Sequence, residues 1–267
     1  MMNLALQQVA IGWALAINKV KMQTKEHIIG YGWAILTPVI YAVCFIFVKQ
    51  GITGGQFAND QAHWMDVLRA FMGISLIQLW FQLLREISDL VRRRRSLLRG
   101  MTISEKPLIL AVIFESSIGL FIRVILIALA VLILHLSLPG TIAGWAWCIL
   151  CLCTLLFSAT AIGLILAPWA ALYPDVGEGI RSITMPMIMI SPVFYPATNQ
   201  VDTALFWLNC LNPMAPVIAT LVDILESKKP FYEYALIIWF SLSVILAIWA
   251  SRKLKKQIPI LLERLGS

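Results

Sequence analysis

Glu115 and Arg123 are the two side chains with the strongest reason to do chemistry, because both lie inside a long apolar stretch. An ionisable group in hydrocarbon is costly and usually faces protein or water. A spacing of eight residues corresponds to about 80° around a helix and about 12 Å along it, too far for a direct pair within one helix. We expect each side chain to meet a partner on a neighbouring helix or to snorkel to an interface. The alternative is that the two line or gate a substrate path.

Cysteines at 148, 151 and 153 form a C-x-x-C-x-C pattern, which on a soluble loop would suggest metal binding or redox chemistry. Here the pattern lies in an apolar stretch, where cysteine usually packs as a small hydrophobe. No Gly-Lys pair occurs in the chain, so it has no Walker A phosphate-binding loop. We therefore expect no metal site, no catalytic residue and no bound cofactor. ATP and Mg²⁺ would be held by a separate ATPase subunit.

A run of four arginines, Arg92, Arg93, Arg94 and Arg95, follows two acidic residues at 86 and 89. One interpretation is a topology anchor on anionic lipid, to which each basic residue contributes about 1 kcal/mol. The alternative is a docking segment for a cytoplasmic partner or a phosphorylated lipid head group. Nucleic acid is the weakest candidate, because the cluster lies close to predicted membrane spans.

The elements that must position these residues follow from composition. The chain has 267 residues, of which 60% are hydrophobic and 13% charged, with a mean hydropathy of +0.84. These values exclude a soluble globular domain, a disordered chain and a nucleic-acid binder. A bilayer span needs about 20 apolar residues. We predict an all-α integral membrane protein with six transmembrane helices at about residues 28–48, 64–84, 108–136, 142–169, 182–201 and 234–251.

A seventh apolar stretch, 203–225, breaks at residues 212–216, where two prolines occur. The half on either side of the break reaches only about 13–14 Å as a helix, so neither half crosses a bilayer. A seventh crossing would also move the basic tail outside and violate the positive-inside rule. We predict a re-entrant helix pair that dips in from the outer face between spans five and six.

The two ends of the chain carry much of the basic charge. Residues 1–27 have apolar positions at helical spacing together with lysines, which predicts an amphipathic helix in the cytoplasmic interface. A signal peptide is the alternative, but its basic residues should precede the apolar run rather than follow it. Residues 252–267 are predicted to form a basic cytoplasmic tail. With six spans between these ends, sixteen of the 21 basic residues fall on the cytoplasmic side, and so do both termini.

Four motifs carry a family resemblance. They are G-x-x-W-A-x-L-x-P at residues 30–38, Tyr-Pro-Asp-Val at 173–176, Ser-Pro-Val-Phe-Tyr at 191–195 and Leu-Asn-Pro-Met-Ala-Pro at 211–216. In order and spacing, the chain resembles over nearly its whole length the permease subunit of ABC-2 type polysaccharide exporters, which move O-antigen, teichoic acid and capsule chains. Pro174 replaces the arginine usual in the second motif.

The resemblance implies a homodimer in the bacterial inner membrane, with a channel along its two-fold axis and two cytoplasmic ABC ATPase subunits beneath it. It implies that the paired short helices form a periplasmic gate and that residues 3–27, 84–106 and 173–181 contact the ATPases. The gate residues would be Trp207, Asn212, Pro213 and Pro216. The coupling residues would be Arg92, Arg93, Arg94, Arg95, Asp175 and Glu178.

Aromatic residues supply the predicted substrate path. A glycan presents hydroxyl groups and weakly apolar C–H faces, so its path needs aromatic platforms with few fixed charges. Trp33, Tyr41 and Phe45 lie broadly on one face of the first span, and Phe194 and Tyr195 end the fifth. The alternative is packing at the lipid interface.

These features predict the export of a lipid-linked polysaccharide of the O-antigen or capsule type, in contact with membrane lipids and without nucleic acid. One alternative is an ABC-2 exporter of a drug or simple lipid. Another is a membrane enzyme acting on lipid-linked sugars, for which Glu86 and Asp89 are the nearest paired carboxylates.

Overall fold

The computed structural model describes residues 2–26, 61–95, 98, 105–134 and 139–264, with scattered positions between 32 and 47. All regular structure in these ranges is helical. The main elements are α1 (Met2–Glu26), α3 (Gln61–Ser88), α4 (Leu90–Arg93), α6 (Glu105–Ile133), α7 (Ile142–Leu172), α8 (Asp175–Ile190), α9 (Ala204–Leu211), α10 (Met214–Leu225) and α11 (Glu233–Arg264). Most of the predicted first span, 28–48, lies outside the described residues.

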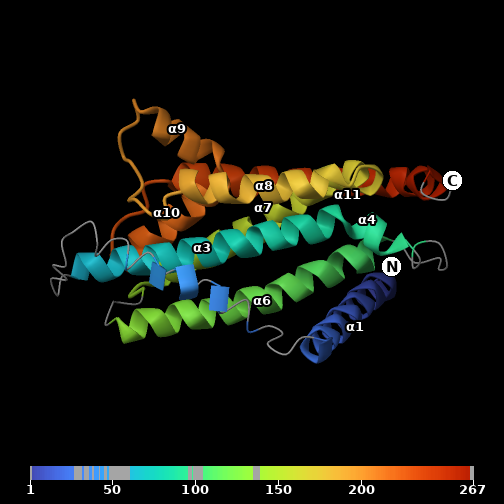
Figure 1. Ribbon diagram of the computed structural model, residues 1–267, viewed down its shortest axis with the longest axis horizontal. Helices are drawn as coiled ribbons and strands as arrows, with labels where there is room; N and C mark the ends of the chain where they lie inside the picture. Colours follow the sequence, from blue (N-terminus) through green and yellow to red (C-terminus); the bar gives the residue numbers. More distant parts are fainter. Residues whose placement is uncertain are drawn as a thin grey trace.

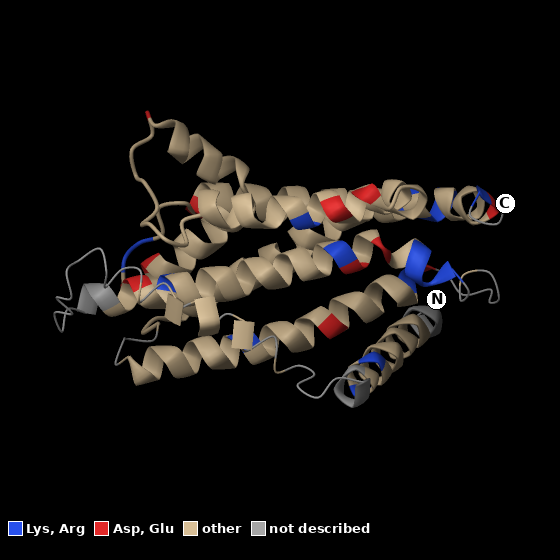
Figure 2. Ribbon diagram, viewed as in Figure 1, with Lys and Arg blue, Asp and Glu red and all other residues tan. Residues whose placement is uncertain are grey.

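The long helices run side by side as an elongated bundle, with α1 laid obliquely against α6 (Figure 1). Both termini and α4 lie at one end of the bundle, and α9 and α10 lie at the other. We call the first the basic end, because Lys and Arg gather there around α4 and the end of α11, and the second the α9 end (Figure 2). The chain therefore begins and ends at the same end of the bundle.

Among the described residues, four helices are long and apolar enough to cross a membrane: Trp64–Ser88, Glu105–Ile133, Ile142–Leu172 and Glu233–Arg264. They cover the spans predicted at 64–84, 142–169 and 234–251 and most of the span predicted at 108–136, whose helix ends at Ile133. The pair α9 and α10, bent by 101° at its break, is either a fifth, broken span or a re-entrant loop. The described residues thus contain four or five candidate spans, fewer than the six predicted for the whole chain.

The prediction of a fifth span at 182–201 is wrong in its bounds. Helix α8 begins at Asp175 and ends at Ile190, and no regular structure follows it up to Thr203. It stops there because Pro192 and Pro196 have no N–H to donate, and Ser191 before the first proline is extended. It begins early because Pro174 starts the turn and acidic side chains in the first turn suit the helix dipole. Its 16 residues span about 24 Å.

The basic tail predicted at 252–267 is helical in its described residues. Helix α11 continues from the apolar segment to Arg264 without interruption. Lys, Arg, Leu and Gln are good helix formers. Leu254, Ile258 and Leu261 recur at helical spacing and are buried, and α7 packs along α11. The basic residues up to Arg264 therefore belong to the same helix as the apolar segment before them.

Helix α3 forms the centre of the bundle, contacting α6, α7 and α8. It approaches α7 closely at Gly163, where a Cβ atom would lie 2.8 Å from the Cβ of Ile87. Between the same helices, Trp80 Nε1 donates a hydrogen bond of 2.9 Å to Ser158 Oγ. Since polar groups buried in a bundle need such partners, these contacts fix α3 against α7.

Helix α1 covers the start of α6 through a face of small residues. A Cβ atom on Gly12 would lie 3.0 Å from Leu110 Cβ, and Ala16 is almost fully buried. Trp13 packs edge-on against Phe114, with ring centroids 5.5 Å apart. Leu6, Val9 and Ile11 remain exposed. An exposed apolar side on such a helix fits the predicted position in the membrane interface.

Candidate functional site

A single lysine ties three helices together at the basic end. Lys19 Nζ of α1 lies 2.5 Å from Glu86 Oε2 of α3 and 2.7 Å from Glu115 Oε2 of α6. The Glu115 side chain is only 4% exposed. A buried carboxylate needs such a charged partner. Lys19 is therefore the partner of Glu115 on a neighbouring helix, and it places a second carboxylate beside the same ammonium group.

Arg123, the other predicted intramembrane charge, is also buried. Its Nη1 atom donates a hydrogen bond of 3.2 Å to the carbonyl of Gly119, one turn earlier in α6. The contact gives one N–H group of the guanidinium a backbone acceptor. This Arg123 contact stays within α6, whereas Glu115 is paired with a lysine of another helix.

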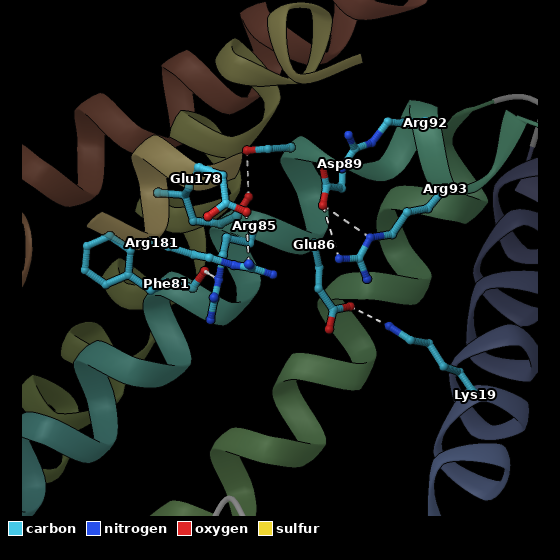
Figure 3. A network of polar contacts seen from close by, with 11 residues as sticks. Lys19, Phe81, Arg85, Glu86, Asp89, Arg92, Arg93, Glu178 and Arg181 are labelled. Atoms are coloured by element: carbon cyan, nitrogen blue, oxygen red, sulfur yellow. Dashed lines mark hydrogen bonds and ion pairs between the residues drawn. The ribbon is translucent and has the colours of Figure 1, made fainter. Parts of the chain in front are cut away.

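A polar pocket of about 340 Å³ opens at the basic end between the α3–α4 turn and the start of α8. Figure 3 shows Arg85 of α3 and Arg181 and Glu178 of α8 facing one another across it. Its described lining is Gln82, Arg85, Glu86, Ser88, Asp89, Arg92, Arg93, Pro174, Asp175, Gly177, Glu178, Ile180 and Arg181. Of the predicted coupling residues, four lie around this pocket, while Arg94 and Arg95 do not belong to its described lining.

The charges around this pocket are organised as ion pairs. Asp89 accepts hydrogen bonds from Arg92 at 3.1 Å and from Arg93 at 3.2 Å (Figure 3). On α8, Arg181 donates to Glu178 at 3.0 Å, and both side chains are more than half exposed. Exposed pairs contribute only about 0–1 kcal/mol each. The exposed Arg181–Glu178 pair can be exchanged for contacts to a charged partner at little cost, which suits a docking surface, whereas the buried Asp89 carboxylate needs its arginines.

Sequence reasoning counted Lys19, Arg85 and Arg181 only as topology signals. The structure shows that Arg85 and Arg181 line the polar pocket and that Lys19 pairs with Glu86, another lining residue. Gly12, Ala16 and Lys19 follow one another at spacings of four and three, which puts them on one helix face. That spacing is the signal that could have identified Lys19 as an inward-facing charge.

At the α9 end, Asn212 holds the break between the two short helices. Its Nδ2 donates to Ser191 Oγ at 2.7 Å, and its Oδ1 accepts from the N–H of Met214 at 2.9 Å. Pro213 begins α10, and Pro216 lies buried in the first turn, where proline is tolerated. These contacts join the break to the segment that follows α8.

An aromatic pocket of about 570 Å³ lies at this end between α9 and α11. Phe206 packs against Trp207, Phe231 and Tyr232 with ring centroids 5.5–6.2 Å apart. Trp239 Nε1 fixes one wall by donating a 2.8 Å hydrogen bond to the carbonyl of Cys210. Sequence reasoning had singled out only Trp207 of these rings, because residues on α9 and α11 are brought together by the fold.

The other predicted path residues are only partly located. Tyr41 and Phe194 are exposed, and the Tyr195 hydroxyl donates to the Ile190 carbonyl. Trp33 and Phe45 lie outside the described residues. Phe194 and Tyr195 follow the end of α8, and this segment lies at the α9 end (Figure 1).

A second bridging cation lies at the α9 end. Arg69 of α3 is 2.6 Å from Asp66 and 3.7 Å from Glu226, which follows α10. Glu226 also accepts from Lys228 at 2.6 Å, and this hydrogen bond raises the pKa of the Lys228 ammonium above its ordinary value. Arg69 therefore joins α3 to the turn that leads from α10 to α11.

Within the described residues, no group of three or more His, Cys, Asp or Glu side chains is arranged to hold a metal ion. The cysteines at 148, 151 and 153 are free thiols on α7.

A comparison with curated proteins finds no significant match. The family profile described as ABC-2 type transporter matches residues 13–225, which is more than half of the chain. The helical bundle and this match together show that the chain belongs to the ABC-2 type transporter family of membrane proteins.

Proposed function

We propose that the chain is the permease subunit of an ATP-driven exporter that moves a lipid-linked polysaccharide across the bacterial inner membrane. It works as a homodimer with two copies of a cytoplasmic ABC ATPase, which hold the ATP and Mg²⁺. Membership of the ABC-2 family supports the transporter role and the need for an ATPase partner. The choice of a glycan as cargo rests on the residues at the α9 end.

The aromatic pocket at the α9 end is the observation that carries the glycan proposal. Six of its described lining residues are aromatic and none is charged: Phe206, Trp207, Phe231, Tyr232, Tyr234 and Trp239 are the aromatic ones. Sugar C–H faces pack on aromatic rings, while tyrosine hydroxyls and indole N–H groups can hydrogen-bond. Without a fixed charge, such a surface can release each sugar as the polymer advances.

The orientation follows from charge. Lys and Arg gather at the end that holds both termini (Figure 2), so by the positive-inside rule this end faces the cytoplasm. The α9–α10 pair then dips in from the periplasmic side. Asn212 and Pro213 at its bend, together with Trp207 on α9, form the gate in this arrangement.

Coupling begins at the polar pocket of the basic end. When ATP closes the ATPase dimer, its surface moves the α3–α4 turn, which carries the ion pairs of Asp89, and the start of α8, which carries the exchangeable pair of Glu178. Lys19 transmits the movement, because it links α1 to both α3 and α6. The bundle then opens beside the two-fold axis and admits the glycolipid.

Deleting the gene and identifying the glycolipid that accumulates on the cytoplasmic side tests the proposed cargo. We expect loss of a surface glycan and build-up of its lipid-linked precursor, both reversed by the wild-type gene. The variant Trp207→Ala should restore export poorly, whereas Trp145→Ala, an exposed tryptophan on α7 outside the described pocket lining, should restore it fully. Normal surface glycan with no accumulating precursor would refute the glycan proposal and favour a drug or simple-lipid cargo.

A further inference from the structure

A groove of about 350 Å³ runs between α7 and α11 at the basic end, apart from the polar pocket described above. Its floor is apolar and buried, formed by Leu164, Leu254 and Leu261 among others. Its rim carries three exposed aromatic residues, Trp169, Tyr173 and Trp249. Its volume is within the range of pockets that hold small ligands.

The groove lies where α11 leaves the hydrocarbon. Helix α11 has no charged residue from Tyr234 to Ser251, and basic residues begin at Arg252. Tryptophan and tyrosine gather at this depth of a membrane protein, beside the lipid head groups. A ligand in this groove therefore has one part in hydrocarbon and another at the level of the head groups.

Polar groups follow one stripe of α11 in an order that matches a phospholipid. Trp249, Lys253 and Gln257 are each one turn apart, and Arg264 stands further along the same groove. Lys253 Nζ is held 4.9 Å from the centroid of the Trp249 ring. Charge near the groove is positive, since its described lining includes Lys253 and Arg264 and no acidic residue.

Gln257 contributes a second, independent feature. Its Oε1 atom is buried and has no hydrogen-bond partner among the described residues. A buried acceptor left without a donor costs free energy of desolvation, so it indicates a missing donor.

We propose that this groove binds an anionic phospholipid of the phosphatidylglycerol class. Its phosphate contacts Lys253, its glycerol head group donates a hydroxyl to Gln257 Oε1 one turn further from the hydrocarbon, and an acyl chain covers the apolar floor. A cationic side chain selects the phosphate, and an orphaned acceptor selects a head group that carries a hydroxyl donor. The groove anchors α11 to a lipid at the membrane surface and does not depend on which cargo is exported.

Native mass spectrometry of the purified complex tests this site, using added phosphatidylglycerol and phosphatidylethanol. Both lipids carry one negative charge, but only the first has head-group hydroxyls. The wild type should retain phosphatidylglycerol severalfold better than phosphatidylethanol. Lys253→Gln should lower retention of both lipids about fivefold, the factor expected for one basic contact. Gln257→Leu should abolish the preference between them.

Lys256→Gln is the matched control, because it removes the same charge from an exposed position of α11 outside the described lining. It should retain both lipids like the wild type. Equal losses in the Lys253 and Lys256 variants would overturn the proposal, since they would indicate diffuse attraction to charge. So would equal retention of the two lipids by the wild type. Loss of the ATPase subunit from the Lys253 variant with lipid retention unchanged would identify a protein contact instead and would also overturn it.

Discussion

Each end of the bundle holds a cation between two carboxylates, but the two arrangements differ in what they join. Lys19 at the basic end links α1, α3 and α6, and one of its partners, Glu115, is almost fully buried. Arg69 at the α9 end links its own helix to the turn after α10, and its partners are about a fifth to a third exposed. The first joins three separate helices, and the second fastens one turn.

The pockets near Lys19 and Arg69 also differ in their chemistry. The basic end has a polar pocket with one exposed, exchangeable ion pair, Arg181–Glu178, whereas the α9 end has the buried apolar helix α10 and the aromatic pocket. Ion pairs that cost little to exchange suit a surface that meets a partner. Rings without fixed charge suit a surface over which a polymer passes. The comparison therefore assigns coupling to one end and cargo to the other.

Removing the two bridging cations should have the largest effect and should separate the two ends. Lys19→Met leaves Glu115 buried without its cation, which should destabilise the protein by about 3–5 kcal/mol. Arg69→Met leaves two carboxylates that are more exposed to solvent than Glu115, so its loss of stability should be clearly smaller. Lys229→Met, which removes a highly exposed partner of Glu233, should change stability little. Thermal unfolding in detergent measures all three.

A double variant sharpens this test. Lys19→Met combined with Glu115→Gln should recover part of the lost stability, because the uncompensated charge is removed. If Lys19→Met were no more destabilising than Lys229→Met, the three-helix link would not be an important contact, and the contrast between the ends would disappear.

Asn212→Ala should have the next largest effect, of about 2 kcal/mol. It leaves the N–H of Met214 and the hydroxyl of Ser191 without this partner at a buried position. Thermal unfolding should show the loss, and proteolysis should show earlier cleavage between α9 and α10. Asn199→Ala, at an exposed position of the same end, is the control and should behave like the wild type. Equal behaviour of the two variants would mean that the bend does not depend on Asn212.

Trp207→Ala should act on transport more than on stability. Its ring is more than half exposed and packs against Phe206, so its removal should cost about 0.5–1.5 kcal/mol of contact to a passing sugar. We expect the apparent KM for the glycolipid to rise roughly two- to tenfold, with basal ATPase activity unchanged. Trp145→Ala should leave both values unchanged. A fall in ATPase activity without a change in KM would show that Trp207 acts in coupling, which would contradict the assignment of coupling to the basic end alone.

The long spans could be predicted from the sequence because uncharged runs and the bilayer thickness decide them. The helices containing residues 64–84 and 142–169 extend only a few residues beyond their predicted ends. The break at residues 212–213 was predictable for the same reason, since prolines interrupt the apolar run. The end of α8 was missed because uncharged residues continue past Ile190, while the backbone of Ser191 and the prolines after it end the helix.

The sites were less predictable, because they depend on which helix faces meet. Lys19 and Glu115 are 96 positions apart, and the local spacing that marks Lys19 as inward-facing does not indicate which carboxylate it meets. The aromatic pocket joins α9 to the start of α11 in the same way. Asp175 was singled out by a motif and Glu178 by the segment that contains it, and the fold brings both to the pocket lined by Arg92 and Arg93.

Reconstituted transport by a charge-swapped variant tests the central claim most directly. Glu178→Lys with Arg181→Glu keeps the net charge and an ion pair within α8 but exchanges the two signs at the basic end. Since an exposed pair contributes about 0–1 kcal/mol, the variant should fold like the wild type. In liposomes with the ATPase subunit, we predict retained basal ATP hydrolysis but loss of ATP-driven glycolipid movement. Wild-type movement by this variant would contradict the assignment of coupling to the basic end.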